Sequence, residues 1–138
     1  MYLLDTNVVC ELRKPRCDTN VRRWVGQWNP TQFFLSVVVL MELEYGICLV
    51  ERRDDRQGQM LRTWLQEAVL PGFTGRVIEV SAAVARRCAA MQASKPAGLA
   101  DAMIAATAIE HRMVVVTRNI EDFRDAGVAI INPWTAPA

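Results

Sequence analysis

The sequence predicts an α/β domain, a three-layer α/β/α sandwich whose central, mainly parallel sheet is covered by helices on both faces. The runs Met1 to Leu4 (MYLL) and Met113 to Thr117 (MVVVT) are too short for helices and continuously apolar, as in strands buried on both faces. Segments with helical spacing of apolar residues separate the short runs along the chain. With 138 residues, 51% of them hydrophobic, the chain can bury one core but not two.

Five short segments are predicted strands. The first, Met1 to Leu4, ends at Asp5-Thr6-Asn7, where the chain turns into a helix. The other four are residues 33–36, 76–80, 113–117 and 128–131. We expect the strands at 1–4 and 113–117 to lie in the middle of the sheet, because they are short, apolar and β-branched or aliphatic.

The predicted helices begin at capping residues and end at helix breakers. Asp18 and Ser81 precede two of them as N-caps, and Pro71-Gly72 is expected to halt a third. The helices span residues 18–28, 37–50, 57–70, 81–92 and 99–112, and a helical turn follows at 120–124. Residues 1–132 are predicted to form a single domain, with residues 133–138 as a C-terminal tail.

The composition argues against membrane, secreted and globally basic classes of protein. A net charge of +1 gives no field that would draw the whole chain to nucleic acid, so any such site must be local. The N-terminus reaches Asp5 without a basic segment, unlike a signal peptide, and Glu42 and Glu44 interrupt the longest apolar run. We therefore expect a cytoplasmic protein whose four cysteines are reduced.

The single histidine restricts the available chemistry. His111 lies where a helix is predicted to end, which favours a role as a capping side chain. A His/Cys zinc site lacks ligands at usable spacing, and a Ser-His-Asp triad lacks a serine elbow. If the protein is an enzyme, carboxylates must carry its chemistry.

Four acids stand in apolar surroundings where a lone charge is costly: Asp5, Glu42, Asp101 and Asp122. Asp5 and Asp122 follow the two predicted central strands, and Glu42 and Asp101 lie on helices expected to begin at the same end of the sheet. Such a cluster repels itself unless a cation neutralises it, and Mg²⁺ or Mn²⁺ prefers oxygen ligands. A metal of this kind can activate water for attack on a phosphodiester. The four acids therefore predict hydrolysis of nucleic acid.

Other interpretations of these residues remain open. Each acid taken singly could be a helix cap, a first-turn acid or a solvated helix position. A phospho-acceptor signalling domain also uses acids at strand ends with a Lys-Pro dipeptide, here Lys95-Pro96, but this dipeptide follows a helix. A catalytically inactive binding module on the same fold is a further alternative.

Four motifs, in this order along almost the whole chain, resemble those of one known family. They are LDTN (4–7), SVVVLMELEYG (36–46), LADAMIAATA (99–108) and VTRNIEDF (116–123). Together they resemble the PIN-domain ribonucleases, in particular the VapC and FitB-like toxins of toxin–antitoxin modules. The resemblance implies a PIN-like α/β/α fold and an endoribonuclease dependent on Mg²⁺ or Mn²⁺, with Asp5, Glu42, Asp101 and Asp122 as catalytic, metal-binding acids.

The resemblance also implies supporting residues and partners. The polar positions that would orient the carboxylates, waters or a phosphate are Thr6, Asn7, Ser36, Thr117 and Asn119. An RNA substrate, a homodimer and an antitoxin whose C-terminal segment enters the acidic site are expected. Some relatives carry an acid at the position of Asn119, or one turn beyond Asp101 where this chain has Ala105, so the number of metals stays open.

Basic and aromatic residues suggest further contacts. Arg118 and Arg13, close to the two strand ends, are candidate contacts for RNA phosphates. The tryptophans at 24, 28 and 64 have helical spacing with aliphatic residues and are interpreted as core or partner interface. We expect dimer or antitoxin contacts on the helices at 18–28 and 57–70.

Overall fold

The computed structural model describes residues 1–135 and contains a five-stranded sheet with the order β3-β2-β1-β4-β5. The strands are β1 (Tyr2–Leu4), β2 (Phe33–Ser36), β3 (Val77–Ile78), β4 (Val114–Val116) and β5 (Ile130–Ile131). All four pairings are parallel; Tyr2 pairs with Phe33, and Leu3 pairs with Val115. The predicted parallel sheet and the interior position of β1 and β4 are confirmed. The edge strands β3 and β5 are shorter than predicted, since each has a neighbour on one side only.

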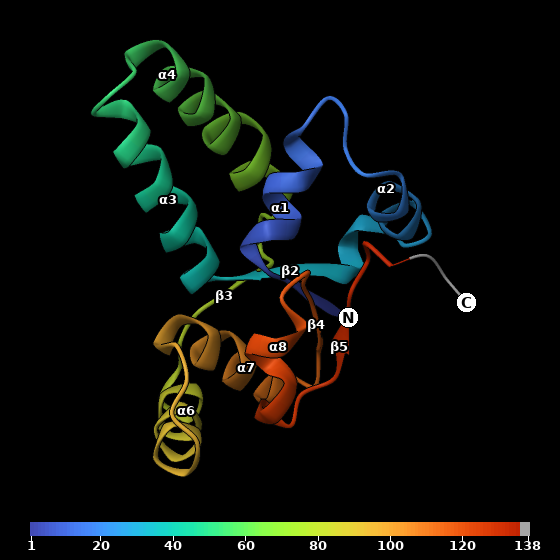
Figure 1. The fold of residues 1–138 in the computed structure, drawn as a ribbon, viewed down its shortest axis with the longest axis vertical. Helices are drawn as coiled ribbons and strands as arrows, with labels where there is room; N and C mark the ends of the chain where they lie inside the picture. Colours follow the sequence, from blue (N-terminus) through green and yellow to red (C-terminus); the bar gives the residue numbers. More distant parts are fainter. Residues whose placement is uncertain (136–138) are drawn as a thin grey trace.

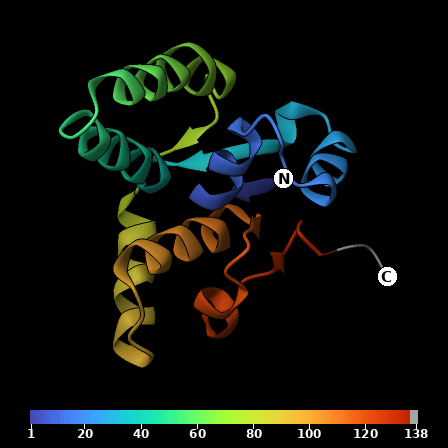
Figure 2. The same cartoon turned by 45° about the horizontal axis from the view of Figure 1, so that its top comes forward.

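Helices cover both faces of this sheet (Figure 1). One face carries α1 (Thr6–Arg13), α2 (Thr19–Gly26), α3 (Val37–Glu51) and α4 (Asp55–Trp64). The other carries α6 (Ala82–Ser94), α7 (Leu99–His111) and α8 (Ile120–Phe123). Figure 2 shows the same three layers from a second direction. Short 3-10 turns, η1 (Pro30–Gln32) and η3 (Arg124–Ala126), lie before β2 and after α8. The three-layer prediction is thereby confirmed.

The core lies on both sides of the central strands. Leu3, Val115 and Val116 have no measurable exposure, which explains why these strands lack polar alternation. A second cluster joins α6 to α7 through Val84, Cys88, Ala102 and Ala106, whose small side chains let the two helices approach closely. Phe123 of α8 is also fully buried, so this short helix is held against the core.

The segment after α4 corrects one prediction. The helix predicted at 57–70 begins at Asp55 and continues through Pro71, as a π-helical turn (η2, Leu65–Val69) followed by α5 (Leu70–Gly72). The Leu70 N–H donates to the Leu65 carbonyl, five residues earlier. Proline lacks an N–H and its ring clashes with the carbonyl four residues before it in an α-helix. The wider turn displaces that carbonyl, so the helix passes the proline instead of stopping there.

The hairpin of α3 and α4 is held by one close backbone approach and one arginine. A Cβ on Gly58 would lie 2.7 Å from Glu51 Cα, so only glycine fits this position without a shift. Arg62 of α4 donates to both Glu44 and Glu51 of α3. Neither this hairpin nor any other helix within residues 1–135 is long and apolar enough to cross a membrane.

Several smaller predictions are also settled. His111 is the last residue of α7, as expected, and Arg112 ends that helix in the left-handed conformation (φ 55°). All four cysteines are free thiols. Trp24 and Trp64 pack against the core, while Trp28 is 39% exposed and stacks on Tyr2.

The predicted tail divides into two parts. In residues 133–135, Pro133 is buried and the Trp134 carbonyl accepts a hydrogen bond from Asn20 of α2. Residues 136–138 of that predicted tail lie outside the described part of the chain.

Candidate active site

Asp5 is the most firmly held of the four acids. It follows β1 directly, caps α1, and is 5% exposed. Its Oδ1 accepts a hydrogen bond from the Thr6 N–H (2.8 Å), and its Oδ2 accepts from Thr117 Oγ1 (2.8 Å) and Asn7 Nδ2 (3.3 Å). Burial raises the pKa of Asp5, and the charge of Asp122 raises it further, while these hydrogen bonds act in the opposite direction. The carboxylate is therefore fixed in position and partly stripped of water.

Thr117 and Asn7 connect the ends of β1 and β4. Thr117 Oγ1 donates to Asp5 and accepts from Asn7 Nδ2 and from the Asn119 N–H. Asn7 Oδ1 in turn accepts from the Arg118 N–H (3.2 Å). This network orients Asp5 as the sequence predicts for Asn7 and Thr117. Asn119 takes part through its backbone, and its side chain is exposed.

Glu42 reaches the same edge of the sheet from α3. Its Oε1 accepts a hydrogen bond from Thr6 Oγ1 (2.9 Å), one residue after Asp5. The direction of α3 is set at its start, where fully buried Ser36 accepts from the Val38 N–H as the N-cap. Ser36 thus positions the helix that carries Glu42.

Asp101 and Asp122 approach from the other face of the sheet. Asp101 lies in the first turn of α7, and Asp122 is an exposed residue of α8. Burial raises the pKa of Asp101 from 3.8 to about 6, and the charges of Asp5, Asp122 and Glu42 contribute to that rise. The structure therefore brings Asp101 within electrostatic range of the other three predicted acids, and Asp5 within range of Asp122, at the carboxyl edge of the sheet.

Within residues 1–135, no lysine or arginine forms an ion pair with these four acids. Among residues 1–135, the ion pairs that lysine and arginine form involve other carboxylates, such as Glu44, Glu51 and Glu110. In the same part of the chain, no group of three or more Asp, Glu, His or Cys side chains is arranged to hold a metal ion. The oxygen donors suit Mg²⁺ or Mn²⁺ in type and charge. Asp5, Glu42 and Asp122 all raise the pKa of Asp101 by their charge, and a divalent cation bound between some of these carboxylates would offset that repulsion.

The two arginines predicted to contact RNA both stack on tryptophans. The Arg118 guanidinium lies 5.3 Å from the ring centroid of Trp134, and that of Arg13 lies 5.8 Å from Trp64. Both side chains remain exposed. Arg118 is adjacent to the Thr117 network, whereas Arg13 lies at the far end of α1 from Asp5.

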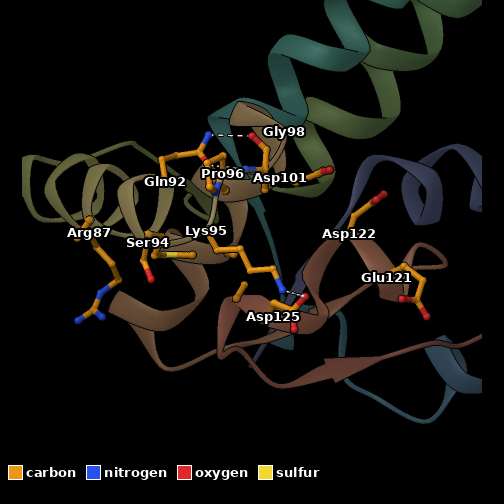
Figure 3. Close-up of a pocket in the computed structure, with 16 residues that line it drawn as sticks. Arg87, Gln92, Ser94, Lys95, Pro96, Gly98, Asp101, Glu121, Asp122 and Asp125 are labelled. Carbon is orange, nitrogen blue, oxygen red and sulfur yellow. Dashed lines mark hydrogen bonds and ion pairs between the residues drawn. The ribbon is translucent and has the colours of Figure 1, made fainter.

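A cavity of about 580 Å³ opens beside Asp101 and Asp122. It lies between α6, the loop 95–98, α7 and the segment of α8 and η3 (Figure 3). Lys95 pairs across it with Asp125, and Gln92 bonds to both the N–H and the carbonyl of Ala97. In the sequence, Lys95-Pro96 indicates only the signalling alternative. The lysine-bearing loop just before the helix of Asp101 is the signal that could have indicated this cavity.

This architecture matches known proteins. The profile of the PIN domain matches residues 2–129. Toxin FitB of Neisseria gonorrhoeae is 34% identical over 139 residues, which cover 97% of this chain and 99% of the toxin. The chain belongs to the PIN-domain family. Within it, the chain groups with the VapC and FitB toxins; VapC ribonuclease Y4jK of Sinorhizobium fredii is 35% identical, with 97% and 98% of the two chains covered.

Solved PIN-domain structures agree with this assignment. The FitAcB crystal structure from Neisseria gonorrhoeae superposes with a TM-score of 0.90 and 33% identity, covering 99% of this chain and 100% of its own. A toxin–antitoxin complex from Klebsiella pneumoniae gives a TM-score of 0.71 and 27% identity, covering 99% and 100%. The PIN-like fold predicted from the four motifs is thereby confirmed, and the phospho-acceptor alternative is set aside.

Proposed function

We propose that this PIN domain is a metal-dependent endoribonuclease, the toxin of a toxin–antitoxin module, that hydrolyses RNA phosphodiester bonds. The observation that carries the proposal is the set of four electrostatically coupled acids, unpaired with lysine or arginine within residues 1–135, at the carboxyl edge of a PIN-domain sheet. Relatives named as ribonucleases or as an endonuclease, including the tRNA(fMet)-specific endonuclease VapC of Shigella flexneri at 30% identity, support the reaction class.

Asp5, Glu42, Asp101 and Asp122 would hold the metal, which is Mg²⁺ or Mn²⁺. When bound, such an ion lowers the pKa of water and offsets negative charge on the phosphate. Asp5 contributes a carboxylate that three hydrogen bonds hold in place, so it is oriented before substrate arrives. Thr6 orients Glu42 through the 2.9 Å bond to its Oε1.

The chain's own residues also position the RNA. Arg118 lies exposed next to the site, where its guanidinium can contact a phosphate while stacked on Trp134. Arg13 is a more distant phosphate contact along the same strand of RNA.

The partners follow from the same family membership. Structures of relatives are described as FitAB bound to a DNA fragment and as toxin–antitoxin complexes. We infer that a cognate antitoxin inserts a C-terminal segment among the acids, and that the toxin is a cytoplasmic homodimer. Apolar side chains exposed on or next to the predicted contact helices, Trp28 after α2 and Met60 on α4, support protein contacts there.

Replacing Asp5 by asparagine tests the catalytic assignment. The change removes one ligand charge at nearly constant volume, so cleavage of total RNA with Mn²⁺ should be lost while the fold is kept. The measurement compares RNA fragments from the wild type, Asp5→Asn and an EDTA control, with circular dichroism for folding. A folded Asp5→Asn protein that still cleaves RNA in a metal-dependent manner contradicts the assignment. The inactive binding module becomes the better description if wild-type protein neither binds Mn²⁺ nor cleaves.

A further inference from the structure

The cavity beside Asp101 and Asp122 is a site that the four acids do not explain. Its volume of about 580 Å³ lies within the range of pockets that enclose small molecules. Two of the proposed metal ligands form one of its walls, so the cavity continues directly from the place where the scissile phosphate would lie. A cavity in this position can take a nucleotide adjacent to that phosphate.

The lining combines an apolar interior with two cations, Lys95 and Arg87, and with two further acids, Glu121 and Asp125. Alanine and methionine side chains form the interior: Ala90, Met91, Ala102, Ala105 and Ala126. Ala105 and Ala102 are buried, and their small side chains leave room in the cavity for a planar ring. Lys95 reaches across the cavity from its loop to Asp125, and Arg87 lies beyond it on α6 (Figure 3).

The walls are held before any ligand binds. Gln92 Oε1 accepts from the Ala97 N–H (2.7 Å), and Gln92 Nε2 donates to the Ala97 carbonyl (2.9 Å). Two hydrogen bonds therefore hold the backbone of the loop against α6. Gly98 follows, where a Cβ would come 3.5 Å from Asp101 Oδ2. Gly98 and Asp101 both line the cavity, so the Asp101 carboxylate borders it directly. A preformed cavity loses less entropy on binding than one that must close.

We propose that this cavity binds one nucleotide of single-stranded RNA next to the scissile phosphate, with the base between the alanine walls and Lys95 on the neighbouring phosphate. The inference rests on the proposed ribonuclease function and adds to it the element that selects sequence. Binding exchanges the Lys95–Asp125 ion pair for a Lys95–phosphate pair, a small change because both side chains are exposed. A buried base contributes sequence preference, while the phosphate contact adds affinity for any sequence.

The first test fills the cavity. Ala90 and Ala89 are neighbouring exposed residues of α6, and only Ala90 lines the cavity, so Ala90→Trp and Ala89→Trp form a matched pair. Binding of short fluorescein-labelled oligoribonucleotides of A, C or U is measured by anisotropy with Ca²⁺ to neutralise the acids, and a gel checks that the RNA stays intact. Ala90→Trp should weaken binding of the preferred oligonucleotide by about tenfold or more, and Ala89→Trp should bind like the wild type.

The second test separates a phosphate contact from a structural ion pair. Lys95→Gln and Asp125→Asn break the same pair, but only the first removes the cation. Lys95→Gln should weaken RNA binding about threefold or more and reduce the salt dependence by about one contact, whereas Asp125→Asn should bind at least as tightly as the wild type. Equal weakening by both variants overturns the role given to Lys95.

Two results overturn the proposal that the cavity binds a nucleotide. The first is equal RNA affinity of Ala90→Trp and Ala89→Trp. The second is that the wild type binds none of the three oligonucleotides at about 100 μM, the weak end of non-specific binding. Cleavage of total RNA with Mn²⁺ is followed in parallel. If the wild type cleaves RNA but the two tryptophan variants bind RNA with equal affinity, the proposal for the cavity is wrong and the proposed function stands. If the wild type does not cleave RNA but Ala90→Trp binds RNA more weakly than Ala89→Trp, the proposed function is wrong and the binding role of the cavity stands.

Discussion

Asp101→Asn should make the metal-free protein more stable and at the same time abolish its stabilisation by Mn²⁺. Asp101 has a pKa raised from 3.8 to about 6, and one pKa unit corresponds to about 1.4 kcal/mol. The full shift would be about 3 kcal/mol, but Asp101 is partly exposed, and screening by water and salt leaves about 1 kcal/mol of cost for the ionised form. Removing the charge removes that cost from the folded state.

A matched variant isolates this repulsion. Asp101 also interacts favourably with the N-terminus of α7, and Asp55 occupies the same kind of first-turn position in α4. In EDTA at neutral pH, Asp101→Asn should therefore unfold at a temperature about 3–5 °C above that of Asp55→Asn. Adding Mn²⁺ should raise the midpoint of wild type and Asp55→Asn but not of Asp101→Asn. Identical midpoints of the two variants in EDTA would refute the coupling of the four acids.

The pH dependence of that difference has a defined sign. Since the folded-state pKa of Asp101 is raised, the cost of ionisation is fully present above about pH 6 and disappears as the pH falls toward 3.8. The advantage of Asp101→Asn over Asp55→Asn should therefore shrink between pH 6 and pH 4. Thermal melts by circular dichroism across this interval measure it, and an advantage that grows on acidification contradicts the assignment.

Two further predictions concern activity and packing. At low Mn²⁺ concentration, the rate of RNA cleavage should fall up to tenfold per pH unit below about pH 6, because protonated Asp101 cannot ligate a metal. A high Mn²⁺ concentration should restore the rate. A pH profile that does not change with Mn²⁺ concentration would contradict the role of Asp101 as a ligand. Gly58→Ala should lower the free energy of unfolding by about 1–3 kcal/mol, because the new Cβ would lie 2.7 Å from Glu51 Cα. Gly46→Ala should raise the free energy of unfolding by about 0.5–1 kcal/mol, because a Cβ there meets nothing within 4 Å and alanine favours the helix. Urea denaturation distinguishes the two glycines, and equal effects would mean that α3 and α4 separate readily at Gly58.

The sequence predicts the parts of the site that local chemistry determines. An acid directly after a buried strand, such as Asp5, has its place fixed by the strand end, and the apolar surroundings of Asp101 make its charge conspicuous. Tertiary contacts determine what could not be predicted. The stacking of Arg118 on Trp134 depends on how the end of the chain crosses α2, and the cavity depends on the separation of α6 and α8. The passage of the helix through Pro71 depends on a π turn that has no sequence signature of its own.

The hydrogen bond between Thr117 and Asp5 joins residues separated by 112 positions, and it determines when the site can exist. Synthesis of the chain at about 5–20 residues per second takes on the order of ten seconds. Until β4 and Thr117 have been made, Asp5 lacks the neighbouring strand and the hydroxyl that orients its Oδ2. A chain that ends before Asp122 lacks part of the set of acids, so the proposed site requires almost the whole domain to be made.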